Sequence, residues 1–193
     1  MIWSRSFAHD IFDYSEKVKP TEEFGIRDDE AGKEKLKADV LAKNPCDEIA
    51  SILAKELPAF IDYENKEEWN AIVKSEKRND FNFIAVDNNI PYYDKHGNEK
   101  RRCDGMLLTE NTVIFIELKN QAKEWLETAI DQLKSTISHF DDTDGLDRFK
   151  FKKAYICNKA HPNFNYQYKI RIQQFFKETG VSLHPEMVIK NVK

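Results

Sequence analysis

Two acidic residues and one lysine stand where they could do chemistry together. Asp104 opens an apolar segment, and Glu117 and Lys119 stand at the end of a run that begins with Val113-Ile114-Phe115-Ile116. Alternate residues of a strand project to the same face, so Glu117 and Lys119 would lie side by side, roughly 7 Å apart along the backbone. Two carboxylates and an ammonium suffice to hold a divalent metal ion and to cut a phosphodiester. The spacing therefore predicts a metal-dependent cleavage site.

The expected strands explain how these residues would meet. Residues 104–108 and 113–119 both have strand character, and residues 109–111 form a polar connection of the length that joins antiparallel neighbours. Folding back at this turn would carry Asp104 towards Glu117 and Lys119. Charges beside an apolar run need a partner, because an isolated charge is costly to desolvate. The alternative is that Glu117 and Lys119 only end an edge strand and form a surface ion pair, worth about 0–1 kcal/mol.

The donor types favour Mg²⁺ or Mn²⁺ as the cofactor. Carboxylate oxygens are hard ligands that suit these ions better than zinc. The five histidines are scattered, and the three cysteines, Cys46, Cys103 and Cys157, lack metal-ligand spacing and are expected as free thiols. Cys103 is expected to pack rather than to bind metal. The chain has no Gly-rich phosphate loop, which argues against ATP or dinucleotide chemistry.

Asp104 and Glu117-Leu118-Lys119, in their strand–turn–strand context, resemble the PD-(D/E)XK nuclease superfamily. The resemblance covers roughly residues 66–157 and departs from the family pattern at Cys103, where the family often has proline. It implies that Asp104, Glu117 and the Leu118 carbonyl bind the metal and that Lys119 assists the attacking water. It also implies a restriction-endonuclease-like core.

The resemblance implies two further roles, and each candidate residue also has a simpler interpretation. The family often places a glutamine on the helix after the lysine strand, and Gln132 is the candidate; it could equally be an ordinary polar helix residue. Many members supply a third carboxylate from a helix. Glu48, Glu56 and Glu76 compete for that role here, and each could also be an ordinary surface acid.

The net charge of −4 is unevenly distributed. Residues 1–80 carry 13 Lys and Arg against 19 Asp and Glu, a balance of −6, whereas residues 81–193 carry 17 against 15, a balance of +2. Such basic clusters are what phosphate contacts need, although a solvated loop face is the alternative. The residues expected to bind nucleic acid are Lys100, Arg101, Arg102, Lys150, Lys152 and Lys153. Aromatic residues of a late helix, Phe176 among them, could stack bases or pack on the sheet.

The pattern of elements predicts an α/β fold with a mixed central sheet flanked by helices. We expect an acidic, mostly helical N-terminal extension over residues 1–65 and the nuclease-like core over residues 66–193. The expected helices are 30–43, one starting at Asn44-Pro45 and stopped by Pro58, 66–77, 122–139 and 163–178. The expected strands are 81–86, 104–108, 113–119, 151–157 and an interrupted 181–192.

The leading functional expectation is a Mg²⁺-dependent nuclease, most simply a DNA endonuclease of restriction, repair or mobile-element defence type. One alternative is a catalytically inactive immunity or anti-defence protein that binds a protein partner through its acidic N-terminal region. Another is an RNA-cleaving nuclease or toxin. No apolar run approaches membrane-spanning length and the start lacks a signal-peptide pattern, so a cytoplasmic protein is expected. Cutting two strands would call for two sites and hence a homodimer.

Overall fold

The computed structural model describes residues 15–43, 46–75, 81–90, 92–94, 96–160 and 168–190. Within these ranges the chain is an α/β protein with two mixed sheets, one of six strands and one of four. None of the helices in these ranges combines the length and the apolar character that crossing a membrane requires.

The larger sheet has the strand order β1-β5-β6-β7-β8-β9. In this sheet the neighbours among β1, β5, β6 and β7 pair antiparallel, whereas β7, β8 and β9 run parallel. Helices α4 and α5 make the two connections between the parallel strands, as parallel pairing requires. The bounds are β1 Ser15–Lys17, β5 Asn82–Ala85, β6 Gly105–Leu108, β7 Thr112–Lys119, α4 Trp125–Asp144, β8 Phe151–Asn158, α5 Lys169–Thr179 and β9 Ser182–His184.

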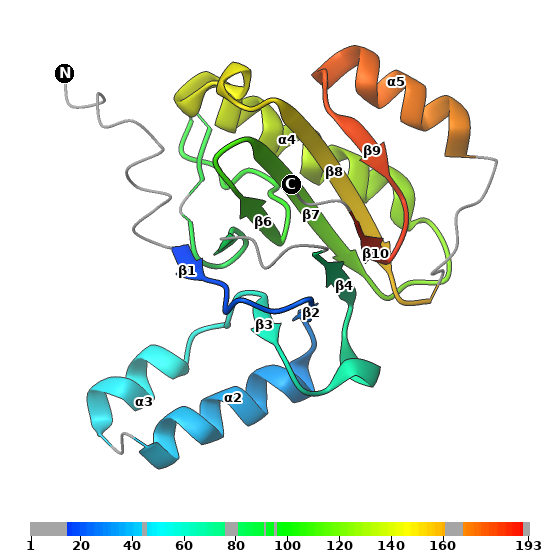
Figure 1. The fold of residues 1–193 in the computed structure, drawn as a ribbon. Coiled ribbons are helices and arrows are strands. Elements are labelled where there is room, and N and C mark those ends of the chain that lie inside the picture. The colour runs from blue at the N-terminus through cyan, green and yellow to red at the C-terminus, as the bar shows by residue number, and fades with distance from the viewer. Residues whose placement is uncertain are drawn as a thin grey trace.

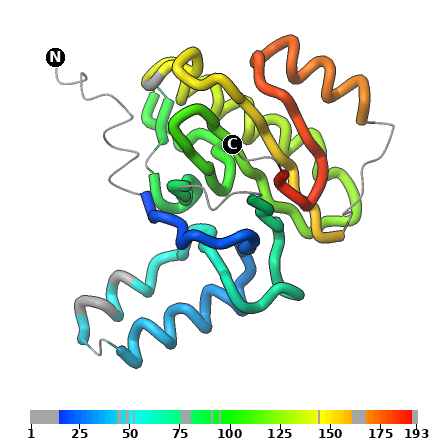
Figure 2. Tube along the Cα trace, in the orientation of Figure 1, coloured from blue at the N-terminus to red at the C-terminus, as the bar shows by residue number. Residues whose placement is uncertain are grey.

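The smaller sheet combines three strands from the first half of the chain with the C-terminal strand. Its order is β10-β4-β2-β3, and the C-terminal strand β10 pairs parallel with β4. Figure 2 shows the red C-terminal segment coming down towards the teal segment that contains β4. The bounds are β2 Glu23–Arg27, β3 Phe60–Asp62, β4 Ala71–Lys74 and β10 Val188–Ile189.

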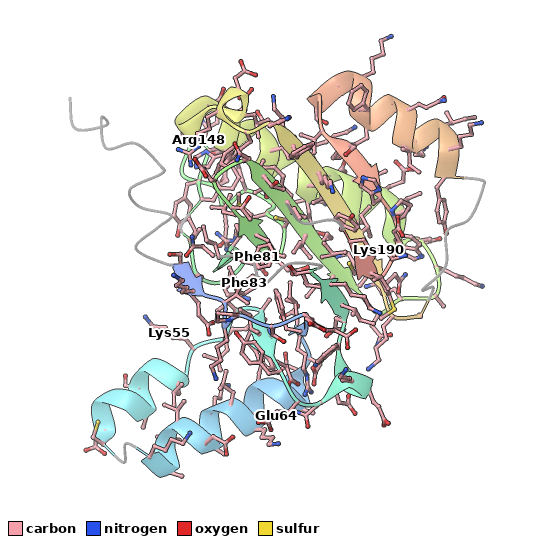
Figure 3. The ribbon with its side chains drawn as sticks, in the orientation of Figure 1. Lys55, Glu64, Phe81, Phe83, Arg148 and Lys190 are labelled. Atoms are coloured by element: carbon pink, nitrogen blue, oxygen red, sulfur yellow. The ribbon has the colours of Figure 1, made fainter. Side chains whose placement is uncertain are left out.

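The larger sheet lies between helices α4 and α5 on one face and the smaller sheet on the other (Figure 1). Its β7 residues Val113 and Phe115 pack in a core with Leu133 and Ile137 of α4. The alternate residues Ile114 and Ile116 belong to a second core, which contains residues of the smaller sheet such as Phe24 and Val73. The β5 residue Phe83, labelled in Figure 3, belongs to the same second core. Strand β7 is therefore buried on both faces, which explains its unbroken apolar character.

Helices α2 (Glu30–Lys43) and α3 (Asp47–Leu53) project away from the two sheets (Figure 1). Asp29 caps the start of α2, because its Oδ1 accepts a hydrogen bond of 2.8 Å from the Gly32 amide. The buried Arg27 side chain donates to Asp29 at 2.7 Å and to Asp62 at 3.0 Å. These bonds fix the first turn of α2 to strands β2 and β3.

Most of the expected elements of residues 81–193 are present, whereas the first half of the chain differs. The helix expected over 66–77 is wrong: a short 3-10 turn, Lys66–Glu68, is followed by strand β4. The expected extension over 1–65 contains strands as well as helices, and β1 and β2 pair with strands from the second region. Pairing with distant strands outweighs the local helical preference in this part of the chain. The helix start expected at Asn44-Pro45 falls outside the described residues.

The contact between Gly25 and Trp69 predicts a position that does not tolerate a side chain. A Cβ built at Gly25 would lie 2.0 Å from Cγ of the buried Trp69 ring. We expect Gly25→Ala to lower the free energy of unfolding by about 1–3 kcal/mol, because the ring must shift within a close-packed core. Urea unfolding measures this change. The cost should be smaller in a Trp69→Phe background, and an equal cost in both backgrounds would contradict the assigned clash.

Candidate metal centre at the fork between β6 and β7

Asp104, Glu117 and Lys119 meet where strands β6 and β7 diverge. The antiparallel register pairs Gly105 with Ile116, so Asp104 stands across from Glu117. The Asp104 carboxylate accepts a hydrogen bond of 2.5 Å from the Leu118 amide. Lys119 Nζ lies 2.5 Å from Glu117 Oε1. We call these four residues, Asp104, Glu117, Leu118 and Lys119, the β6–β7 fork.

The acids of the fork are almost fully removed from water. Glu117 is 0% exposed and Asp104 7%, while the Lys119 side chain is 14% exposed. Glu117 Oε1 lies 2.5 Å from the Lys119 ammonium, whereas Oε2 has no hydrogen-bond donor among the described residues. A buried carboxylate is costly unless it is paired, hydrogen-bonded or bound to a metal. The unsatisfied Oε2 of Glu117 is therefore suited to hold a cation.

Burial raises the pKa of both fork acids. The pKa of Asp104 rises to about 7, chiefly through burial and then through the negative charge of Asp28, against the opposing effect of the Leu118 amide. The pKa of Glu117 rises well above its ordinary value through burial and the charge of Asp104, and Lys119 offsets only part of this rise. A bound divalent cation would favour the ionised form of both groups.

The Leu118 backbone lies on the same side of β7 as Asp104. Its amide donates to the Asp104 carboxylate. Because a strand residue directs its N–H and its C=O to the same neighbouring strand, the Leu118 carbonyl also faces this side. No three His, Cys, Asp or Glu side chains converge on one point in the described part of the chain. A cation at the fork would thus be held by two carboxylates, with the Leu118 carbonyl as the third protein oxygen.

Gln132 of α4 connects the lysine to the strand that carries Asp104. Its Oε1 accepts a hydrogen bond of 2.9 Å from Lys119 Nζ, and its Nε2 donates to the Arg102 carbonyl at 3.1 Å. One turn further along α4, the Thr136 hydroxyl accepts from the Cys103 amide at 2.8 Å. Helix α4 therefore fixes both the Lys119 ammonium and the backbone that precedes Asp104.

Two outer acids near the fork were not expected from the sequence. Asp28 follows β2 and pairs with Lys33 of α2 at 2.7 Å, and Asp87 follows β5 and pairs with Arg102 at 2.9 Å. The charge of each raises the pKa of Asp104. Asp87 could have been found, because it ends the strand expected over 81–86 beside the Asp104 strand. Asp28 follows a strand that the sequence pattern does not show.

Of the three acids expected as a third metal ligand, only the Glu56 side chain lies in the described part of the structure. Glu56 is exposed in the segment after α3, and its charge acts on Asp28 rather than appearing among the causes that shift Asp104. Glu48 lies in α3, but its side chain is outside the described part of the structure, as is the whole of Glu76.

The basic residues expected to bind nucleic acid lie in three different settings. Arg102 is buried, pairs with Asp87 and Glu99 and donates to the Ile90 carbonyl, so its charge is compensated inside the protein. Lys100 and Arg101 are exposed on the segment that leads to Asp104. The third group, Lys150, Lys152 and Lys153, stands at the start of β8, level with the start of β7. Five residues of β7, roughly 17 Å, separate that level from Glu117.

Cys103 is a packing residue. It is fully buried, its amide is hydrogen-bonded to Thr136, and burial raises the pKa of its thiol. Its place in the core with residues of β7 and α4 confirms the expected packing role.

The raised pKa of Asp104 predicts how the stability of the metal-free protein depends on pH. Between the ordinary Asp pKa of about 4 and its folded value of about 7, the folded state keeps a proton that the unfolded state has lost. The free energy of unfolding should therefore fall as the pH rises through this window, by a few kcal/mol. Asp104→Asn keeps the hydrogen-bond acceptor for Leu118 and should flatten the slope in urea unfolding.

Mg²⁺ offers a second measurement on the same two proteins. At about pH 8 it should raise the unfolding temperature of the native chain and leave Asp104→Asn nearly unchanged, because binding to the folded state alone stabilises it. An unchanged pH slope in Asp104→Asn would assign the effect to other groups.

Comparison with protein-family models, with curated proteins and with solved structures gives no match.

Proposed function

We propose that this protein is a metal-dependent phosphodiesterase that cleaves nucleic acid, with Mg²⁺ or Mn²⁺ held at the β6–β7 fork. The observation that carries the proposal is the Glu117 carboxylate, which is buried beside Asp104, contacts the Lys119 ammonium through Oε1 and leaves Oε2 without a hydrogen-bond donor among the described residues. The proposal includes the finer assignment of the larger sheet and its helices to a restriction-endonuclease-like core.

Asp104, Glu117 and the Leu118 carbonyl supply the hard oxygen donors that such an ion prefers. When bound, the ion would polarise a phosphoryl oxygen and lower the pKa of a bound water. Asp104 is held in place by the Leu118 amide, and Glu117 is fixed within the β7 ladder. The acids thus need little reorganisation to receive a cation, which favours preorganised electrostatic catalysis.

Lys119 is the residue suited to act on the substrate. Its ammonium is held from two sides, by Glu117 at 2.5 Å and by Gln132 at 2.9 Å, and the side chain keeps 14% exposure. A positioned cation of this kind can hydrogen-bond a water or the oxygen on which negative charge develops. The complete set of two acids, a lysine and its supporting glutamine favours an active enzyme over a silent binding protein.

DNA is the proposed substrate, with RNA as the alternative that the experiment below separates. Lys100 and Arg101 are exposed on the segment that leads to Asp104, and we assign them to contacts with the substrate phosphates. Arg101 lies 3.6 Å from Asp131, but both side chains are more than 60% exposed, so a phosphate can compete for the guanidinium. Cutting both strands of a duplex would require a homodimer.

Cleavage of supercoiled DNA in the presence of Mg²⁺ or Mn²⁺ tests the proposal. Glu117→Gln and Lys119→Met keep the shape of each side chain and remove its charge, and we expect each to reduce the cleavage rate by about 10²- to 10⁴-fold. Lys177→Met removes an exposed lysine of α5 and should cleave like the native protein.

Calorimetric titration with Mn²⁺ gives a second readout that does not depend on cleavage. Glu117→Gln should lose Mn²⁺ binding, whereas Lys119→Met should retain it. Cleavage that persists in both variants would remove the assigned site. Parallel reactions with single-stranded RNA of the same length decide between the two substrate classes.

Gln132 is a positioning residue, and its two hydrogen bonds can be separated by substitution. Gln132→Met removes both bonds and should lower the cleavage rate by about tenfold, because the Lys119 ammonium loses one of its two anchors. Gln132→Glu keeps an oxygen acceptor for Lys119 and loses the donor to Arg102, so it should retain more activity than Gln132→Met. Both variants should bind Mn²⁺ as the native protein does. Equal activity of the two variants would contradict this role.

A further inference from the structure

A second basic surface lies at the end of the larger sheet opposite to the fork. It is a groove of about 380 Å³ between the start of β8, the end of α5 and the start of β9. We call this groove the lysine groove. Arg148, two residues before Lys150, is labelled in Figure 3 at the end of the molecule away from α2 and α3. The lining residues of the lysine groove are Lys150, Phe151, Lys152, Lys153, Phe176, Gly180 and Ser182.

The lysine groove combines positive charge with exposed aromatic rings. Three lysines and no acid line it. Phe176 is 56% exposed and Phe151 37%, and these are two of the five large hydrophobic residues that are exposed among the described ones. Exposing rings of this size to water is unfavourable. The rings therefore favour a ligand with flat apolar faces as well as negative charge.

Two of the three charges of the groove, those of Lys150 and Lys152, remain available to an anionic ligand. Among the described residues Lys150 has no ion-pair partner, and its ammonium lies 5.4 Å from the centre of the Phe151 ring. Lys152 lies 3.2 Å from Asp147, but the Asp147 side chain is fully exposed. A surface pair of this kind contributes little and can be exchanged for a phosphate.

Helix α5 presents Phe176 at the rim because the helix ends there. Gly180 has a φ of +70°, and its amide donates to the Phe176 carbonyl at 2.8 Å, which terminates the helix. Phe175, the preceding residue, is fully buried in the core. Packing of Phe175 thus holds the backbone of Phe176 in place, while the Phe176 ring stays exposed to solvent.

We propose that the lysine groove binds single-stranded nucleic acid, with phosphates on Lys150 and Lys152 and an unpaired base on Phe176. Unpaired bases offer their faces to aromatic side chains, whereas the bases of a duplex are stacked on one another and cannot. Binding by the lysine groove does not depend on the proposed nuclease activity. The inference rests on that proposed function only where it says which substrate is cleaved. That substrate is a nucleic acid with an unpaired segment that reaches from the fork to the groove. The span is roughly 17 Å, about five base-pair rises of duplex.

Fluorescence anisotropy in the presence of EDTA tests binding without cleavage. The probe is fluorescein-labelled oligothymidylate of about 12 nucleotides, compared with a blunt duplex of the same length. The native protein should bind the single strand more tightly than the duplex. Phe176→Ala should weaken single-strand binding by about tenfold or more, because stacking on one aromatic residue is worth about 1–3 kcal/mol per base. Lys150→Ala should reduce the salt dependence of binding by about 0.7 in the logarithmic slope.

The matched controls come from the same helix. Ile170, 74% exposed at the start of α5, and Lys177, next to Phe176, lie outside the lining of the groove. Ile170→Ala and Lys177→Ala should bind like the native protein. Circular dichroism of each variant checks that the fold is kept.

Three results would overturn the assignment. They are equal loss of binding in Ile170→Ala, unchanged binding in Phe176→Ala, and equally strong Phe176-dependent binding of poly-L-glutamate, which would make the groove a site for acidic polypeptide. The experiments distinguish failure of the single-strand binding inference from failure of the proposed nuclease function. Metal-dependent cleavage that continues without single-strand binding removes only this inference. Single-strand binding that persists in EDTA, with no cleavage when metal is added, removes only the proposed nuclease activity.

Discussion

The burial of the Glu117 carboxylate is the constraint on which the arrangement of the fork depends. Strand β7 lies in the middle of the larger sheet with both faces covered, so a charged residue within it has no access to water. Such a charge is costly unless a partner compensates it. Lys119, two residues along the same face, supplies one positive charge. Asp104 on the opposite strand adds a second negative charge, so the buried fork carries more negative than positive charge. This excess destabilises the fold by itself, whereas a bound cation would compensate it.

The apolar packing of α4 determines where the polar groups of the fork lie. Ala129, Leu133 and Ile137 bury one stripe of the helix against β7. Gln132 and Thr136 lie at the edge of this stripe and therefore face the backbone of residues 102 and 103. The position of the Lys119 ammonium is thus set by the hydrophobic contact of a helix with a sheet, whose burial stabilises the protein far more than a single hydrogen bond does.

Local patterns in the sequence predicted the parts of the fold that depend on neighbours in the chain. The hairpin of β6 and β7 has a three-residue connection and a nearly unbroken apolar strand, so the meeting of Asp104 with Glu117 could be derived from the turn alone. The amphipathic period of residues 122–139 likewise predicted helix α4. Strands β2, β3, β4 and β10 are short, and they pair with partners far away in the sequence. Their signals are weaker than the helical preference of residues 66–77, which led to the wrong assignment there.

The residues around the fork that local patterns missed are those whose role depends on this distant pairing. Asp28 reaches the neighbourhood of Asp104 only because β2 belongs to the sheet that covers the larger one. Arg102 was expected to contact nucleic acid because it belongs to a basic run, but the burial of its guanidinium between Asp87 and Glu99 can be seen only in three dimensions. Charge clusters in a sequence show which residues are basic, and not whether their charges are already compensated.

The outer ion pairs also bear on how an anionic substrate could approach. Asp28, Asp87, Glu99, Asp104 and Glu117 bring five carboxylates to the surroundings of the fork, and Lys33, Arg102 and Lys119 bring three positive charges. With all acids ionised the balance is two negative charges, which repel a phosphate. A divalent cation cancels that balance. The same ion that the buried acids require would therefore remove the local repulsion, so that metal binding and binding of a phosphodiester at the fork are expected to be thermodynamically coupled.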